Sequence, residues 1–197
     1  MPVVIDVETG GLDAKTDALL EIAAVLVERD EQGFFPCEEF AFQVEPFEGA
    51  RIVDKALEIT GIDPNHPLRP ALPESEALQR IFRPVRRALR DNDCTRAILV
   101  GHNAFFDLGF LNAAVERTGI KRNPFHPFVS FDTTTLAGVM LGQTVLARAL
   151  EVAGIQQDPT SAHTAAYDAR VTAELFCLLL NRSDPLYRKA TARSRGT

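Results

Sequence analysis

Two carboxylates stand at the end of the first apolar segment of the chain. Residues 3–8, Val-Val-Ile-Asp-Val-Glu, begin as a run of β-branched side chains, which predicts a buried strand. Side chains at positions i and i+2 of a strand point to the same face, so Asp6 and Glu8 project together. Two neighbouring anions at the end of a buried strand are costly without a cation, and such oxygen ligands suit Mg²⁺ or Mn²⁺. A pair of solvated acids at a strand end would give the same common pattern.

Three further side chains could join this pair. Asp107 follows a later predicted strand, 96–101, by less than two helical turns, and α/β folds place their sites at strand ends. Alone, Asp107 is better explained as a first-turn acid that favours the helix dipole. His163 and Asp168 lie where a loop enters the last predicted helix. A surface histidine and an ordinary first-turn acid are the alternative for this third signal.

The remaining apolar patterns predict the elements that position these side chains. An antiparallel meander comes first, because a turn around Gly33 separates two segments rich in strand-forming residues. Asp54 and Asn103 are candidate helix caps. Alternating strands and helices follow the meander, which indicates an α/β domain with a mixed five-stranded sheet covered by helices on both faces. Strands are expected at 3–8, 18–30, 34–44, 96–101 and 129–132, and helices at 54–60, 74–91, 104–118, 133–141, 143–153 and 164–181.

Composition limits the class of protein. The chain has 197 residues, of which 46% are hydrophobic, enough for one domain with a sizeable core. We expect that domain to span 1–182 and a basic, frayed tail to follow at 183–197. The net charge of −6 requires a nucleic-acid binder to concentrate its basic residues on one surface. Three widely spaced cysteines favour reduced thiols and a cytoplasmic location, and neither a signal peptide nor a membrane-spanning segment is expected.

The chemical signals occur in a specific order along the chain. Asp-x-Glu comes first, His-Asn-Ala-x-Phe-Asp second, and His-x4-Asp last. In this order they resemble the DEDDh subgroup of 3′→5′ exonucleases, which implies a ribonuclease H-like fold. Longer segments are similar to the ribonuclease T family within that subgroup, and this resemblance runs from residue 3 to about residue 182. Those segments are 6–9, 13–24, 44–47, 61–64, 121–128, 131–133 and 142–146.

The resemblance implies a two-metal hydrolysis of the phosphodiester bond. Two Mg²⁺ ions, or Mn²⁺, roughly 4 Å apart would activate water and neutralise the phosphate. Asp6 would bridge the ions, Glu8 and Asp168 would bind one of them, and Asp107 would reach the other through water. His163 would be the general base, since an imidazole suits proton abstraction at neutral pH. Direct contact between His163 and a metal is an alternative.

The same resemblance implies aromatic contacts to the terminal bases. Phe106 and Phe128 stand where the family stacks bases, although core packing is their alternative reading. Leu12 and Ile59 occupy two positions at which the family has phenylalanine. Lys55 replaces a glutamate that discriminates terminal bases in the family, so we expect a different terminal-base preference.

The implied activity is 3′-end trimming of structured RNAs, with release of 5′-mononucleotides. The implied substrates are tRNA, rRNA precursors and other small stable RNAs, with single-stranded DNA ends as further substrates. A homodimer would place a basic surface, Arg90, Arg96 and Lys121, beside the partner's active site. The family also carries basic residues before its first strand. This chain begins directly before that strand, so we expect weaker binding of the RNA body. The alternatives are a proofreading-type DNA exonuclease with the same catalytic residues, and a catalytically inactive nucleic-acid-binding module.

Overall fold

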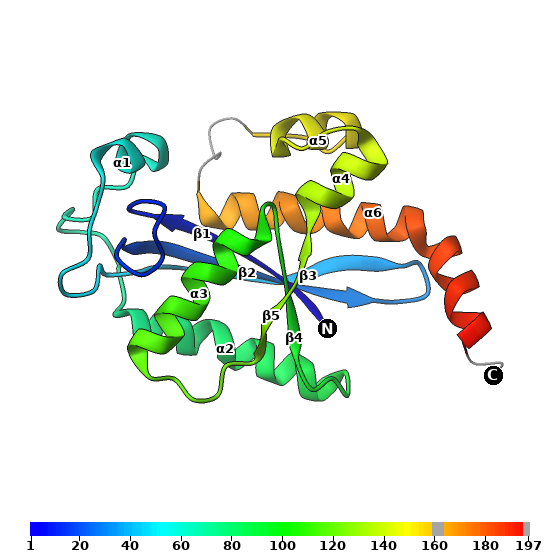
Figure 1. Cartoon of the computed structure of the whole chain (residues 1–197), viewed down its shortest axis with the longest axis horizontal. Coiled ribbons are helices and arrows are strands. Elements are labelled where there is room, and N and C mark those ends of the chain that lie inside the picture. Colours follow the sequence, from blue (N-terminus) through cyan, green and yellow to red (C-terminus); the bar gives the residue numbers. More distant parts are fainter. Residues whose placement is uncertain (159–163, 195–197) are drawn as a thin grey trace.

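A five-stranded mixed sheet is the centre of the computed structural model, which describes residues 1–158 and 164–194, with side chains to residue 185. The strand order is β3-β2-β1-β4-β5 (Figure 1). The antiparallel meander consists of β1 (Pro2–Thr9), β2 (Leu19–Arg29) and β3 (Phe34–Gln43). The parallel part adds β4 (Ala97–Gly101) and β5 (Phe125–Asp132). The predicted mixed sheet is therefore confirmed.

Helices cover both faces of the sheet, as the sequence predicts. Figure 1 shows α2 (Glu74–Asp91) and α3 (Ala104–Thr118) on one side and α6 (Ala165–Ser194) on the other, with α4 (Thr133–Leu141) and α5 (Leu146–Ala153) beside α6. Side chains alternate along β1, so its residues pack in two clusters of the core, one on each face of the sheet. Ile5 and Val7 pack in the cluster that contains α2 and α3, whereas Val4 packs in the cluster that contains α6. The face of β1 that carries Val4 also carries Asp6 and Glu8.

The strand registers decide where the acids meet. β1 pairs with β4 in parallel from Pro2↔Ile98 to Val4↔Val100, so both strands finish at the same end of the sheet. The antiparallel pairing of β1 with β2 sets Glu8 opposite Glu21. The short helix α1 (Asp54–Thr60) lies beside the end of the sheet at which β1 finishes (Figure 1). A site at this end can therefore draw on β1, β2, α1 and α3.

Two element boundaries differ most from the expected ones. β5 begins at Phe125 rather than at residue 129, because Phe125 already pairs with Ala97 before the register shifts. α6 continues to Ser194 rather than ending at residue 181. The Asn181 side chain bonds to the Phe34 backbone, and Asp184 pairs with Arg29 at 3.0 Å, so the helix runs on along the β2–β3 hairpin. The division into a domain at 1–182 and a tail at 183–197 stays a prediction.

The predicted cap of α1 is wrong, and that of α3 is correct in position but not in its capping bond. Val53, not Asp54, is the N-cap of α1, and Asp54 lies in its first turn. Asn103 is the N-cap residue of α3, with φ of 77°, but its side chain makes no capping hydrogen bond. Oδ1 of Asp132 accepts instead from the N–H groups of Asn103 and Ala104, at 2.9 and 3.4 Å. The cap comes from a neighbouring strand, which local sequence does not reveal.

Across the described residues, no single helix has both the length and the apolar character needed to cross a membrane. The pair α4 and α5, bent by 48°, satisfies these criteria by length and composition alone.

Candidate active site

Three carboxylates converge where β1 meets the start of α6. Ligand oxygens of Asp6, Glu8 and Asp168 all lie within 4.8 Å of one another. Asp6 and Glu8 share a face of β1, as predicted, and Asp168 lies in the first turn of α6. Ala165 and Ala169 are fully buried against the same face, and these small side chains let the helix approach the strand closely. The structure thus unites three of the four predicted metal ligands.

Glu21 is a further acid at this cluster that sequence reasoning did not select. Its Oε2 accepts from the Ala165 N–H at 3.3 Å, which ties the start of α6 to β2. Its Oε1 accepts from Gln43 Nε2, also at 3.3 Å. Because Glu21 lies opposite Glu8 in the β1–β2 ladder, the antiparallel pairing predicted from sequence is the signal that would have found it.

Asp107 approaches the cluster from α3. It is buried, and its Oδ1 accepts from the main-chain N–H of Val7 at 3.1 Å. Gly101 makes room for this side chain, since an added Cβ there would lie 2.8 Å from Asp107 Oδ2. Asp107 is outside the group of three close ligands, but its charge helps to raise the pKa of Asp6. This position agrees with a more distant role than that of the other three acids.

Asp132 joins the N-termini of two helices beside the site. It caps α3 through Asn103 and Ala104, and it caps α4 through the N–H groups of Thr134 and Thr135, both at 3.2 Å. One side chain thereby fixes the turn that leads from β4 into the helix of Asp107.

The acid cluster is electrostatically strained without a cation. Burial raises the pKa of Asp6 well above its usual range, and the charges of Asp107, Asp168 and Glu8 raise it further. Burial, with Asp168, Glu21 and Asp107, raises the pKa of Glu8 from 4.5 to about 8. Burial also raises the pKa of Asp107 to about 8. An all-oxygen set of acids that cannot ionise together fits a hard divalent cation, and Asp6, Glu8 and Asp168 are the residues that would hold it.

A pocket of about 470 Å³ adjoins the cluster, and Glu8 belongs to both. Four of the five residues predicted to contact the terminal bases line it: Leu12, Lys55, Ile59 and Phe106. Leu12 and Ile59 are 87% and 56% exposed, so their apolar surface is available to a ligand. The remaining lining residues are Val7, Thr9, Gly11, Asp17, Arg51, Val53, Ala56 and Thr60.

The other predicted contacts lie elsewhere. Phe128 is 78% exposed on β5, which rules out core packing, but it does not line this pocket. Arg90, Arg96 and Lys121 line a separate hollow of about 410 Å³ together with Arg86 and Arg122. That hollow lies near the start of β4, and the acids lie near the ends of β1 and β4. His163, the predicted general base, is outside the described residues.

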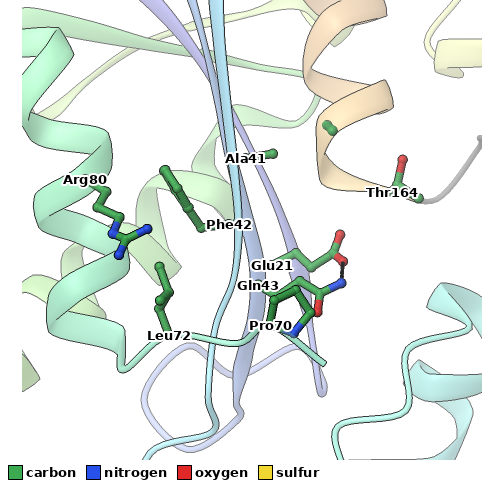
Figure 2. Close-up of a pocket in the computed structure, with 9 residues that line it drawn as sticks. Glu21, Ala41, Phe42, Gln43, Pro70, Leu72, Arg80 and Thr164 are labelled. Carbon is green, nitrogen blue, oxygen red and sulfur yellow. Dashed lines mark hydrogen bonds between the residues drawn. The ribbon is translucent and has the colours of Figure 1, made fainter. Parts of the chain in front are cut away.

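A larger hollow, of about 620 Å³, opens beside β3 at the edge of the sheet. Figure 2 shows Arg80, Phe42 and Leu72 on one side of the strands and Thr164 on the other. Glu21 and Gln43 line it too, joined by their hydrogen bond. The residues that line this hollow lie on both sides of the strands, and none of the three close metal ligands is among them.

Comparisons with known proteins identify the family and the fold. The model of an exonuclease family, RNase_T, matches residues 3–176. The fold is similar to that of E. coli exonuclease I in complex with a dT13 oligonucleotide, with 20% identity and a TM-score of 0.71 over 95% of this chain and 42% of that chain. For exonuclease I from Methylocaldum szegediense, the identity is 21% and the TM-score is 0.70, over 97% of this chain and 42% of that chain. For a full-length 3′-exonuclease, the identity is 17% and the TM-score is 0.65, over 92% of this chain and 82% of that chain.

The chain spans less than half the length of the exonuclease I structures that it matches. At these identities the likeness concerns the fold, and it confirms the predicted ribonuclease H-like α/β architecture.

Proposed function

This chain belongs to the exonuclease family whose model spans residues 3–176, and from that premise we propose a divalent-metal-dependent exonuclease that removes nucleotides from single-stranded 3′ ends. One observation carries the proposal. The ligand oxygens of Asp6, Glu8 and Asp168 converge within 4.8 Å, directly beside a pocket that shares Glu8. A nucleotide held in that pocket would have its phosphate next to the acids.

One set of residues would hold the cation, and another set would hold the base. When bound, a divalent metal ion activates water and neutralises the phosphate. Asp6, Glu8 and Asp168 would hold it, with Asp107 contributing more remotely, and we propose His163 as the general base. Leu12, Ile59 and Phe106 offer an apolar surface of the kind on which unstacked bases pack. The pocket volume is within the range of small-molecule sites.

We further propose RNA as the principal substrate, as the resemblance to the ribonuclease T family implies. The substrates would be single-stranded 3′ tails of tRNA and rRNA precursors, with Mg²⁺ as the cofactor, in the cytoplasm. Support comes from the hollow formed by Arg86, Arg90, Arg96, Lys121 and Arg122, whose described lining holds no acid and would attract a phosphate backbone. Because this hollow and the acids lie at different ends of the strands, a homodimer would let one subunit bind the RNA body beside the other's site.

A DNA exonuclease is the second candidate. The exonuclease I structures with the same fold include complexes with DNA oligonucleotides, such as the one with dT13. The catalytic acids would be the same for both substrates. The identity of the nucleic acid is therefore the point that experiment must settle.

The test is a comparison of RNA and DNA hairpins that carry the same short single-stranded 3′ tail. Each is incubated with Mg²⁺, or with EDTA, and the products are resolved by length. We expect stepwise loss of 3′ nucleotides with Mg²⁺ alone, faster from RNA, and no loss with Asp168→Ala. Faster loss from DNA would favour the second candidate. Tight binding without any cleavage would indicate an inactive binding module and overturn the proposed function.

A further inference from the structure

The pocket beside the acids contains an arginine that a buried carboxylate holds in place. Arg51 Nε donates to Asp17 Oδ1 at 2.6 Å, and Arg51 Nη2 donates to Asp17 Oδ2 at 3.1 Å. The Asp17 side chain is fully buried, whereas that of Arg51 is 60% exposed and lines the pocket. Such a two-point contact fixes the plane of a guanidinium group.

The carboxylate is itself firmly held. Asp17 accepts from the Asp13 N–H and from the Thr16 hydroxyl, both at 2.9 Å. The hydrogen bond from Arg51 lowers the pKa of Asp17 to about 2, so Asp17 stays charged at neutral pH. A Cβ at Gly11 would lie 2.1 Å from Asp17 Oδ2, which means that Gly11 leaves room for this side chain.

The backbone fixes the arginine from the other end. The Arg51 N–H donates to Thr16 O at 2.8 Å, and the Arg51 carbonyl accepts from Ala18 N–H at 3.0 Å. These bonds join the loop that follows β1 to the loop that precedes α1. Arg51 therefore needs little reordering to present its outer edge to a ligand, and this lowers the entropic cost of a contact.

One edge of the guanidinium remains available. Nε and Nη2 are engaged by Asp17, and Nη1 makes no hydrogen bond to any part of the chain that the structure describes. The outer edge offers parallel donors from Nη1 and Nη2 and no acceptor. Arg51 lines the pocket together with Leu12, Ile59 and Phe106, whose apolar surface suits a base rather than a phosphate. Because Asp17 neutralises Arg51, the pair also has little long-range attraction for an anion.

We propose that Arg51 is a specificity-determining residue that donates two hydrogen bonds to O6 and N7 of a 3′-terminal guanine. This inference rests on the proposed function and names the base that the pocket prefers. Guanine presents two adjacent acceptors on this edge, whereas adenine presents N7 beside the N6 donor, which would face an arginine donor. Both edges of a base are accessible when it is unstacked at a single-stranded end.

The test uses oligonucleotides that differ only in the last nucleotide: guanine, adenine, 7-deazaguanine, which lacks N7, or 2-aminopurine, which lacks O6. The rate and KM for removal of that nucleotide are measured with Mg²⁺. We expect the specificity constant for guanine to exceed that for adenine by about fivefold or more, the lower end of what a bidentate arginine–guanine contact contributes. Both analogues should lose most of this advantage.

Arg51→Lys tests the residue itself, because lysine keeps the charge but lacks the fork. The guanine-to-adenine ratio should fall towards one. Arg117→Lys is the matched control: Arg117 makes the same two-point contact, through Nε and Nη2 to Glu74, but lies outside the pocket. Its ratio should equal that of the wild type. If Arg51→Lys does not fold, the analogue series on the wild type still shows whether O6 and N7 of the terminal guanine are recognised.

The outcomes separate the two proposals. Equal removal of guanine, adenine and both analogues by the wild type would overturn the role of Arg51 and leave the exonuclease standing. A loss in Arg51→Lys that is the same for every terminal base would identify a phosphate contact and also overturn the inference. Failure of the wild type to remove any nucleotide would overturn the proposed function instead.

Discussion

The main-chain N–H of Val7 donates to Oδ1 of Asp107 at 3.1 Å, across 100 positions of sequence. This bond joins the strand of Asp6 and Glu8 to the first turn of α3. The bond engages Oδ1 of Asp107, whereas Oδ2 lies beside Gly101.

Asp107→Asn should separate the hydrogen bond to Val7 from the charge of Asp107. The amide oxygen can still accept from Val7, so the fold should persist, while the charge beside the cluster is lost. We expect the affinity for Mn²⁺ to fall by about 10- to 100-fold, as for other residues that support metal ligands from outside. Calorimetric titration with Mn²⁺ measures this, and an unchanged affinity would exclude Asp107 from the metal site.

Gly101→Ala should displace Asp107 without removing its charge. The new Cβ would lie 2.8 Å from Asp107 Oδ2 and 3.0 Å from Ala104 Cα, so the start of α3 must shift. Overpacking of this kind costs about 1–3 kcal/mol of stability. Urea unfolding measures the cost, and nuclease assays should show a loss of activity in the fraction that remains folded. Full activity at wild-type stability would mean that the site tolerates movement of this helix.

The local pattern of the sequence predicted the acids but not what holds them. Asp6 and Glu8 follow from the two-residue period of a strand, and the order of the motifs pointed to Asp107 and Asp168. The contacts from Asp132 to Asn103 and from Arg51 to Asp17 join positions 29 and 34 residues apart, and no local pattern encodes them. The start of β5 was missed for a related reason, since the pairing of Phe125 with Ala97 is not local and the neighbouring Pro124 and Pro127 disguise a strand.

Stability of the metal-free protein should fall as pH rises. Burial and its acidic neighbours raise the pKa of Glu8 from 4.5 to about 8, so between these values the folded protein holds a proton that the unfolded chain has released. The folded state binds more protons in this window, and raising the pH therefore destabilises it. A bound cation replaces those protons, so Mg²⁺ should raise Tm more at pH 8 than at pH 6.

Glu8→Gln provides the control for this pH dependence. It removes the titrating carboxyl group and keeps its size, so the Tm of the metal-free variant should fall less between pH 5 and pH 8. Scanning calorimetry with EDTA measures both slopes. The explanation fails if wild type and variant show the same slope.

Asp132→Ala should destabilise the protein through two helices at once. The side chain accepts from N–H groups at the starts of α3 and α4, and each lost cap costs about 0.5–2 kcal/mol. Asn181→Ala is a matched control, because it removes two side-chain bonds to Phe34 at the far end of the sheet. Both variants should lower the free energy of unfolding, but only Asp132→Ala should also weaken Mn²⁺ binding, by loosening the helix of Asp107. Equal metal affinities would show that Asp132 has no influence on the site.

Leu12→Phe should tighten the binding of a single-stranded 3′ end. Leu12 is 87% exposed at the rim of the pocket, so a phenylalanine there can stack on a base without disturbing the core. Stacking on an aromatic side chain contributes about 1–3 kcal/mol per base, which corresponds to a Kd lower by about fivefold or more. Fluorescence anisotropy with a labelled oligonucleotide, in EDTA to prevent cleavage, measures the change. Val139→Phe adds an aromatic ring at a similarly exposed position on α4, outside the pocket, and should leave Kd unchanged. If both variants bind more tightly, the gain reflects general hydrophobic attraction; if neither does, Leu12 does not border the path of the substrate.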